Sequence, residues 1–275
     1  MVFSRFQGVF QFLVYSNYWV SGVAMLLYFQ TQVFQGIPSR WWELVTVFSA
    51  TCASYSFQRL SISNARNLST SELWWFQKKQ FLRIQVLFFG LLCLLCFPYR
   101  WFSFYGLLGI CTIVSIFYAW PVPWKGKKVV LRNYPLVKIF LIAFSWAIFT
   151  GVLAQDEVYT TASLLVFVDR FLWVFAFTLP FDLRDVEQPM PITIPQVLGP
   201  QKVLVVAAFI ALLSLFITGY SQEGSNRMPI FIGGIAAILL LAFSRKGRSA
   251  LFYGLWLEGA LLGPLTAYLL WISLK

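Results

Sequence analysis

The sequence predicts an all-α integral membrane protein, folded as a bundle of nine transmembrane helices. Its composition is 59% hydrophobic and only 11% charged, whereas soluble domains carry about 25% charged residues. Apolar runs recur along the whole chain at roughly the 20 residues that a helix needs to cross a bilayer core of about 30 Å. Lysine and arginine cluster in the short stretches between these runs, as the positive-inside rule describes.

We expect one polytopic membrane domain covering residues 1–275, with spans separated by turn-forming and polar stretches. QGIPSR at 35–40 and SQEGSNRMP at 221–229 are two of these breaks. The N-terminal stretch has no small-residue cleavage site after its apolar part, which indicates a first span rather than a removed signal peptide. The expected spans are residues 9–30, 42–61, 81–97, 101–120, 134–154, 160–181, 202–220, 229–244 and 250–272.

The formal net charge is +11, from 21 Lys and Arg against 10 Asp and Glu. The basic residues fall mainly into loops on one side of the expected membrane, so their excess favours membrane orientation over a nucleic-acid partner. We therefore expect the N-terminus and the basic loops to lie in the cytoplasm, in a membrane of the bacterial cytoplasmic type. Anionic membrane lipids are expected neighbours of these loops; the oligomeric state is left open.

The chain contains no histidine, which excludes imidazole as a general base or metal ligand. Four cysteines lie in apolar segments, and the pair Cys93 and Cys96 has no second pair or other ligand type nearby in the sequence. Packing is a better interpretation of these cysteines than zinc or redox chemistry.

The segment FDLRDVEQPM at 181–190 gathers acids in a chain that is poor in them. If the helix continues through it, Asp182 and Asp185 are three residues apart and share a face. Two such carboxylates suit magnesium, which typically takes one or two carboxylates, waters and a substrate phosphate. Arg184 and Glu187 would extend the cluster. The alternative is a helix end whose charges are simply solvated, and spacing alone does not decide between the two.

Two further stretches could bind a phosphate group. YAWPVPWKGKK contains Lys125, Lys127 and Lys128, which could capture a diphosphate, although composition alone favours a positive-inside marker. The stretch after residue 54 contains Arg59 and Asn64 but no carboxylate before Glu72. A polar interfacial loop is the favoured interpretation of that stretch.

Three charges fall inside expected spans: Asp169, Arg170 and Glu258. Intramembrane charges are costly and usually face the bundle interior. Asp169 and Arg170 are adjacent and point in different directions, so we expect Arg170 or its neighbour to find Glu258, a backbone carbonyl or an aromatic face. A polar lock between helices is slightly favoured over a pocket-lining role.

Taken together, several segments resemble the UbiA superfamily of membrane prenyltransferases. FTLPFDLRDVEQ is similar to the second acidic motif of that family, and ITIPQVLG is similar to the stretch that follows it. FYAWPVPWKGKK resembles the basic loop between the fourth and fifth helices, and LVYSNYWVSGVAML resembles the first helix. The likeness extends over nearly the whole chain.

The resemblance implies a nine-helix bundle that transfers a prenyl group from a polyprenyl diphosphate to a lipophilic or aromatic acceptor. It implies magnesium held by Asp182, Asp185 and Glu187, with Asp182 and Asp185 as the catalytic pair. Polar and basic side chains would contact the substrate. These are Arg59, Asn64, Tyr118, Lys125, Lys127, Lys128 and Arg184.

The sequence departs from the family at two places. The acidic motif at the end of the second helix is represented by Ser56, Leu60 and Asn64, and the last acid of the second motif is replaced by Pro189. These departures keep a second hypothesis open, a non-catalytic protein that binds isoprenoid lipid or acts as a membrane scaffold. A third hypothesis, a small transporter using the intramembrane charges, is weaker because no matching halves with mid-span breaks are evident.

Overall fold

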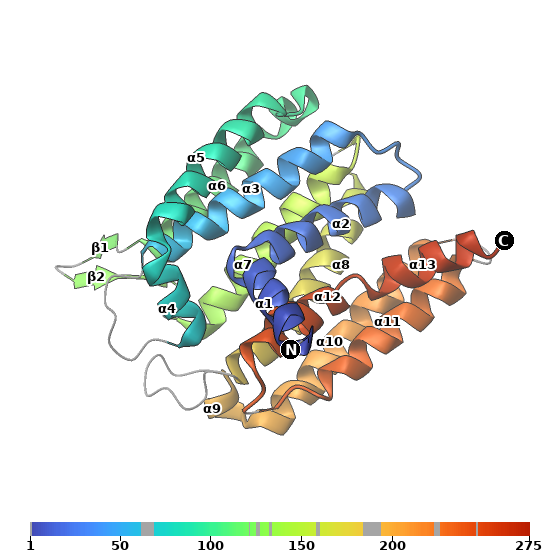
Figure 1. The fold of residues 1–275 in the computed structure, drawn as a ribbon. Coiled ribbons are helices and arrows are strands. Elements are labelled where there is room, and N and C mark those ends of the chain that lie inside the picture. Colours follow the sequence, from blue (N-terminus) through green and yellow to red (C-terminus); the bar gives the residue numbers. More distant parts are fainter. Residues whose placement is uncertain are drawn as a thin grey trace. The chain divides into compact units, whose positions relative to one another are not determined.

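The computed structural model describes residues 2–61, 69–120, 122–124, 127–131, 134–157, 160–183, 194–222, 226–245 and 247–275. These residues are mostly helical, as predicted, with one two-stranded antiparallel hairpin that was not predicted (Figure 1). In the hairpin, β1 (Val122–Trp124) pairs with β2 (Lys127–Val129).

The chain divides into two compact units. The first comprises Met1–Met25 and Ser39–Arg132, and the second comprises Leu26–Pro38 and Asn133–Lys275. The boundary near residue 25 falls within α2. Elements α1 to β2 otherwise belong to the first unit and α7 to α13 to the second. The prediction of a single domain stays a prediction.

The helices of the first unit begin with a broken pair, where one span was predicted over residues 9–30. α1 (Val2–Tyr15) and α2 (Tyr18–Phe34) are bent by 67° relative to each other. Asn17 lies at the break with φ of +65°, a conformation that Asn tolerates better than most residues. Its side-chain amide donates a hydrogen bond of 3.2 Å to the hydroxyl of Ser56, which stabilises the break.

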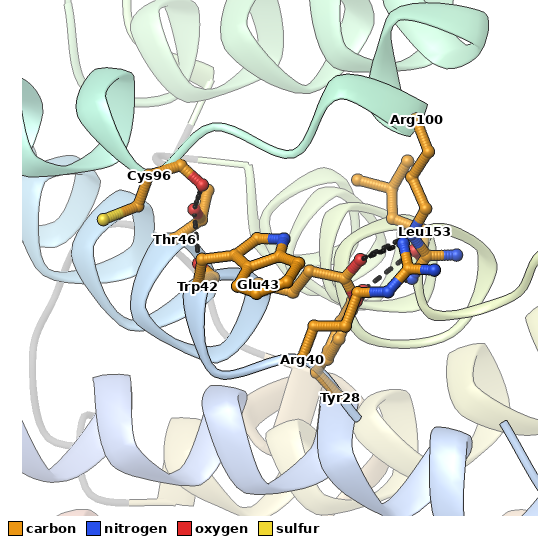
Figure 2. A network of polar contacts seen from close by, with 8 residues as sticks. All are labelled: Tyr28, Arg40, Trp42, Glu43, Thr46, Cys96, Arg100 and Leu153. Carbon is orange, nitrogen blue, oxygen red and sulfur yellow. Dashed lines mark hydrogen bonds and ion pairs between the residues drawn. The ribbon is translucent and has the colours of Figure 1, made fainter. Parts of the chain in front are cut away.

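The rest of the first unit is built around α3 (Trp41–Leu60), which packs against α5 and α6 (Figure 1). Near its start, Glu43 is buried and accepts hydrogen bonds of 2.6 and 2.8 Å from the guanidinium of Arg100, and Thr46 donates to the carbonyl of Cys96 (Figure 2). These contacts tie α3 to the turn that follows α5. The other elements of this unit are α4 (Thr70–Gln77), α5 (Lys79–Leu95), the 3₁₀ helix η1 (Tyr99–Phe104) and α6 (Tyr105–Ala119).

In the second unit, α8 (Thr161–Thr178) packs against α7 (Pro135–Thr150) on one side and α10 (Pro200–Ser221) on another. Phe140 and Phe144 of α7 make ring contacts with Phe171 and Phe167 of α8. Shorter elements complete this part of the unit: η3 (Val152–Ala154), η4 (Leu179–Leu183) and α9 (Ile194–Leu198).

The last two helices of the second unit approach each other closely. α11 (Arg227–Leu241) packs against α13 (Gly263–Ser273) with Gly233 and Gly263 face to face, where a Cβ on either glycine would collide with the backbone carbonyl of the other. Close contact through small residues is typical of membrane helices.

The predicted final span, residues 250–272, is also a broken pair. The π-helix η6 (Phe252–Leu257) and α12 (Glu258–Ala260) are followed by α13 at an angle of 55°. Pro264 explains the break, because its ring displaces the carbonyl four residues earlier, that of Ala260, from helical hydrogen bonding.

The count of nine spans is not confirmed, although helices overlap all nine predicted segments. Among the described residues, the stretches Leu136–Ala154, Thr161–Leu183 and Pro200–Ser221 are long and apolar enough to cross a membrane. The count rises to five if each bent pair is one span. α3 does not qualify because Ser, Thr, Gln and two charged side chains interrupt its apolar character. These apolar helices nevertheless indicate an integral membrane protein.

Candidate functional site

Asp182, in the acidic segment, forms an ion pair with a lysine of α7. Oδ1 of Asp182 lies 2.9 Å from Nζ of Lys138. The side chain of Asp182 is only 2% exposed and that of Lys138 is 25% exposed. The side chain of Asp182 is therefore inside the second unit, and the side chain of Lys138 is the more accessible member of the pair.

Local structure explains how these two side chains meet. α8 does not continue through the acidic segment as an α-helix but tightens into η4 at Leu179, and Pro180 and Leu183 of η4 are buried. Asp182 is thereby held inside the unit instead of at a solvated helix end. Lys138 lies at the end of the first turn of α7, the helix that begins at Pro135.

Sequence reasoning missed Lys138. The residue is the only charged side chain of α7, PLVKIFLIAFSWAIFT. A lone charge in an apolar helix is a signal in itself, but its partner lies 44 residues away along the chain, and no local pattern connects them.

Only one of the three predicted magnesium ligands, Asp182, lies within the described residues. The described residues contain no group of three or more His, Cys, Asp or Glu side chains placed to hold a metal ion. Asp182 already has a cation at one oxygen, and its side chain is almost completely buried. Its second oxygen, Oδ2, is buried and has no hydrogen-bond partner among the residues that the structure describes. Arg184, Asp185 and Glu187 lie outside the described residues, so their roles stay predictions.

The end of α3 provides a second cationic group, in the first unit. The guanidinium of Arg59 lies 3.8 Å from the ring centre of Trp75 and 6.0 Å from that of Tyr55. A guanidinium over an aromatic face makes a cation–π contact, and its five N–H donors suit phosphate oxygens. Asn64, predicted nearby, lies outside the described residues.

Ser56, the predicted counterpart of the first residue of the family's first acidic motif, is part of a buried polar network. Its hydroxyl donates a hydrogen bond of 3.2 Å to Gln85 and accepts one from Asn17. The amide of Gln85 in turn donates to the carbonyl of Ser16 at 3.1 Å. This position therefore carries neutral, hydrogen-bonded side chains that join the break between α1 and α2 to α3 and α5, and Ser56 supplies no carboxylate for a metal ion.

The remaining predicted substrate residues also belong to the first unit. Tyr118 lies in the last turn of α6 and is partly buried. Lys127 and Lys128 lie on β2. Lys125 falls between the two strands, outside the described residues. The predicted contacts of these residues with substrate stay predictions.

The intramembrane charges of α8 each have partners on other helices. Asp169 Oδ1 accepts hydrogen bonds from Ser214 at 2.6 Å and from Thr218 at 2.8 Å, both on α10. Nη2 of Arg170 donates to the hydroxyl of Thr31 at 2.8 Å and to the carbonyl of Leu27 at 3.3 Å. A backbone carbonyl, one of the expected partners, is thus bound by Arg170. The contacts of Asp169 and Arg170 favour the role of a polar lock between helices.

Comparison with known proteins adds one result. No family profile matches the chain, and no curated protein matches it significantly. A solved structure of digeranylgeranylglyceryl phosphate synthase, a prenyltransferase of the UbiA family, is similar to it with a TM-score of 0.54 and 17% sequence identity. The match covers 94% of this chain and 96% of the other. The chain has the UbiA fold. The predicted resemblance is therefore confirmed at the level of the fold, and the coverage leaves no large part of either chain outside it.

Proposed function

We propose that the chain is a UbiA-type membrane prenyltransferase that transfers a prenyl group from a polyprenyl diphosphate to a lipophilic or aromatic acceptor. The observation that carries the proposal is the buried carboxylate of Asp182, in the acidic segment, paired with Lys138 of α7, within a fold shared over almost the whole chain with a prenyltransferase. The structural relative is named for a lipid product, which favours a lipid acceptor for this chain as well.

The proposed reaction breaks the bond between the first prenyl carbon and the diphosphate oxygen. The diphosphate leaves with the electron pair, and the allylic carbocation is captured by a nucleophilic atom of the acceptor, which then loses a proton. Lysine and arginine stabilise the charge that develops on the leaving group. The 29 Phe, 12 Trp and 12 Tyr of the chain supply the aromatic surroundings in which a carbocation is protected from water.

Magnesium remains part of the proposal only through residues that the structure does not describe. Asp185 and Glu187 are the proposed ligands, and Asp182 was predicted to join them. The basic loops, including Lys125, Lys127 and Lys128, are proposed to face the cytoplasm, where a soluble diphosphate would be released. The acceptor and the length of the prenyl chain are not assigned.

The alternative function, non-catalytic binding of an isoprenoid lipid, rests on one observation. Ser56 is bound into a neutral buried network where the family places the first residue of a metal-binding motif. A chain that lost metal chemistry could keep the fold and the lipid.

Lipid mass spectrometry separates the two functions. Membranes of cells with the wild-type chain, without it, and with Asp185→Ala are compared for prenylated lipids. Catalysis predicts one or more prenylated species that disappear with the gene and do not return with Asp185→Ala. If the lipid profile is the same in all three, while purified protein retains a bound isoprenoid lipid, the binding function replaces the catalytic one.

A further inference from the structure

The two members of the ion pair in the second unit differ in accessibility, and this difference has a chemical meaning. A metal ligand must present its carboxylate to the metal and to the substrate phosphates around it. Here the side chain of Asp182 is 2% exposed and that of Lys138 is 25% exposed. The lysine side chain is therefore the member of the pair that an approaching anion can reach more easily.

A buried carboxylate is an effective anchor for such a lysine. Removing a charge from water is costly unless it is paired and hydrogen-bonded, so Asp182 strongly favours conformations of Lys138 that keep the 2.9 Å contact. Lysine otherwise has a flexible side chain with a compact charge and three donors. Anchoring reduces that flexibility, and three donors allow one ammonium to contact a carboxylate and a phosphate together.

The surroundings of the pair favour an anchored lysine over a metal ligand. The described residues provide no acid cluster, and the nearest identified partner of Asp182 is already a cation. The positive charge next to Asp182 is thus the ammonium of Lys138, where the sequence predicted a magnesium ion.

We propose that Lys138 contacts the diphosphate of the substrate directly, and that Asp182 is the positioning residue that holds its ammonium in place. This inference rests on the proposed function and assigns Asp182 a role different from the predicted metal ligand. As the bond between carbon and oxygen breaks, the ammonium stabilises the negative charge on the leaving diphosphate. Any magnesium ion is then held by other groups, with Asp185 and Glu187 as the predicted ligands.

The test measures binding of inorganic diphosphate, which needs no knowledge of the acceptor or the prenyl chain. Isothermal titration calorimetry is performed on the full chain in nanodiscs of zwitterionic lipid, so that anionic headgroups do not compete. Lys138→Met should weaken diphosphate binding by about tenfold or more, the loss expected for a charge-assisted contact. Lys138→Arg should restore most of the binding. Lys202→Met, which removes an exposed lysine from the first turn of α10, is the matched control and should bind as the wild type does.

A second measurement separates anchoring from metal ligation. Binding of Mn²⁺ in the absence of diphosphate is followed by electron paramagnetic resonance. The inference predicts the same Mn²⁺ affinity for the wild type, Lys138→Met and Asp182→Asn, and weaker diphosphate binding in Asp182→Asn. Loss of Mn²⁺ binding in Asp182→Asn, or wild-type diphosphate binding in Lys138→Met, would overturn it.

Removing Lys138 alone leaves a buried carboxylate without its cation, so a folding control is needed. If Lys138→Met does not give monodisperse protein, the double variant Lys138→Met/Asp182→Asn removes both charges and nearly preserves the volume. Its diphosphate affinity should fall as predicted for Lys138→Met, and wild-type affinity in this variant would overturn the inference. Failure of the proposed function has a different signature, since diphosphate would bind through Lys138 while no prenyl transfer occurs.

Discussion

The guanidinium of Arg59 stacks 3.8 Å from the ring centre of Trp75. Trp75 is itself fixed, because its indole N–H donates a 2.8 Å hydrogen bond to the carbonyl of Tyr15, at the end of α1. One tryptophan therefore connects the first helix break to the cation at the end of α3. Any diphosphate contact by Arg59 depends on that ring.

Trp75→Leu should weaken diphosphate binding by severalfold, because a contact worth about 0.5–2 kcal/mol that orients Arg59 is lost. Trp75→Phe keeps an aromatic face and loses only the indole N–H, so it should retain more of the binding. Titration calorimetry with inorganic diphosphate compares these variants. Trp74→Leu, the same change one residue earlier in α4, is the control. If Trp75→Leu binds diphosphate as tightly as the wild type does, Arg59 as oriented by Trp75 is not part of the diphosphate site.

The buried ion pair of Glu43 and Arg100 predicts a large stability effect. Glu43→Ala should lower the free energy of unfolding by about 3–5 kcal/mol, because the guanidinium loses the carboxylate that compensates its charge. Arg40, whose Nη1 is 3.8 Å from Glu43 and whose side chain is 47% exposed, is the control. Arg40→Ala should cost about 1 kcal/mol or less. Denaturant unfolding in detergent measures both, and equal effects would contradict a special role for Arg100.

Gln85 joins the polar network of the first unit and has no charge to lose. Gln85→Leu should cost about 1–3 kcal/mol, because Ser56 and the carbonyl of Ser16 are left buried with fewer partners. Gln80→Leu makes the same substitution at an exposed position of α5 and should change stability little. Thermal unfolding followed by circular dichroism compares the two. If Gln85→Leu is as stable as the wild type, then Asn17 and Ser56 stabilise the helix break without Gln85.

The contact of α11 with α13 has no space for a side chain on Gly233. Gly233→Leu should separate these helices and lower the midpoint of thermal unfolding, because the new side chain meets backbone atoms of Gly263. Gly90→Leu is the control, since nothing lies within 4 Å of a Cβ at that position in α5. A stable Gly233→Leu protein would mean that the two helices tolerate a wider separation.

Apolar run length located helices in all nine predicted segments but not the short α4 and α9 between them, because hydrophobic content along the chain is a local property. It was not sufficient to find where they break. The run over residues 9–30 contains no proline, and the break at Asn17 is stabilised by Ser56, 39 residues further along the chain. Pro264 could have signalled the second break, since proline removes a helical hydrogen bond wherever it falls inside a helix.

The candidate site shows the same division. The unusual density of acids identified Asp182, but its partner Lys138 is a single charge in an apolar helix, and only the packing of α7 near η4 brings them together. The spacing of Asp182 and Asp185 also assumed a continuing α-helix, whereas the chain forms a tighter 3₁₀ turn through Asp182.

Prenyl transfer itself is the most direct test of the proposed function. Purified protein in nanodiscs is incubated with a prenyl diphosphate labelled at its first carbon and with lipid extracted from cells that lack the gene. The account predicts that label moves into a new extractable lipid in equal amount to the diphosphate released, and that Asp185→Ala abolishes both. If the labelled diphosphate stays intact with every prenyl chain length and acceptor fraction, while the protein binds it, prenyl transfer is not the function of this chain.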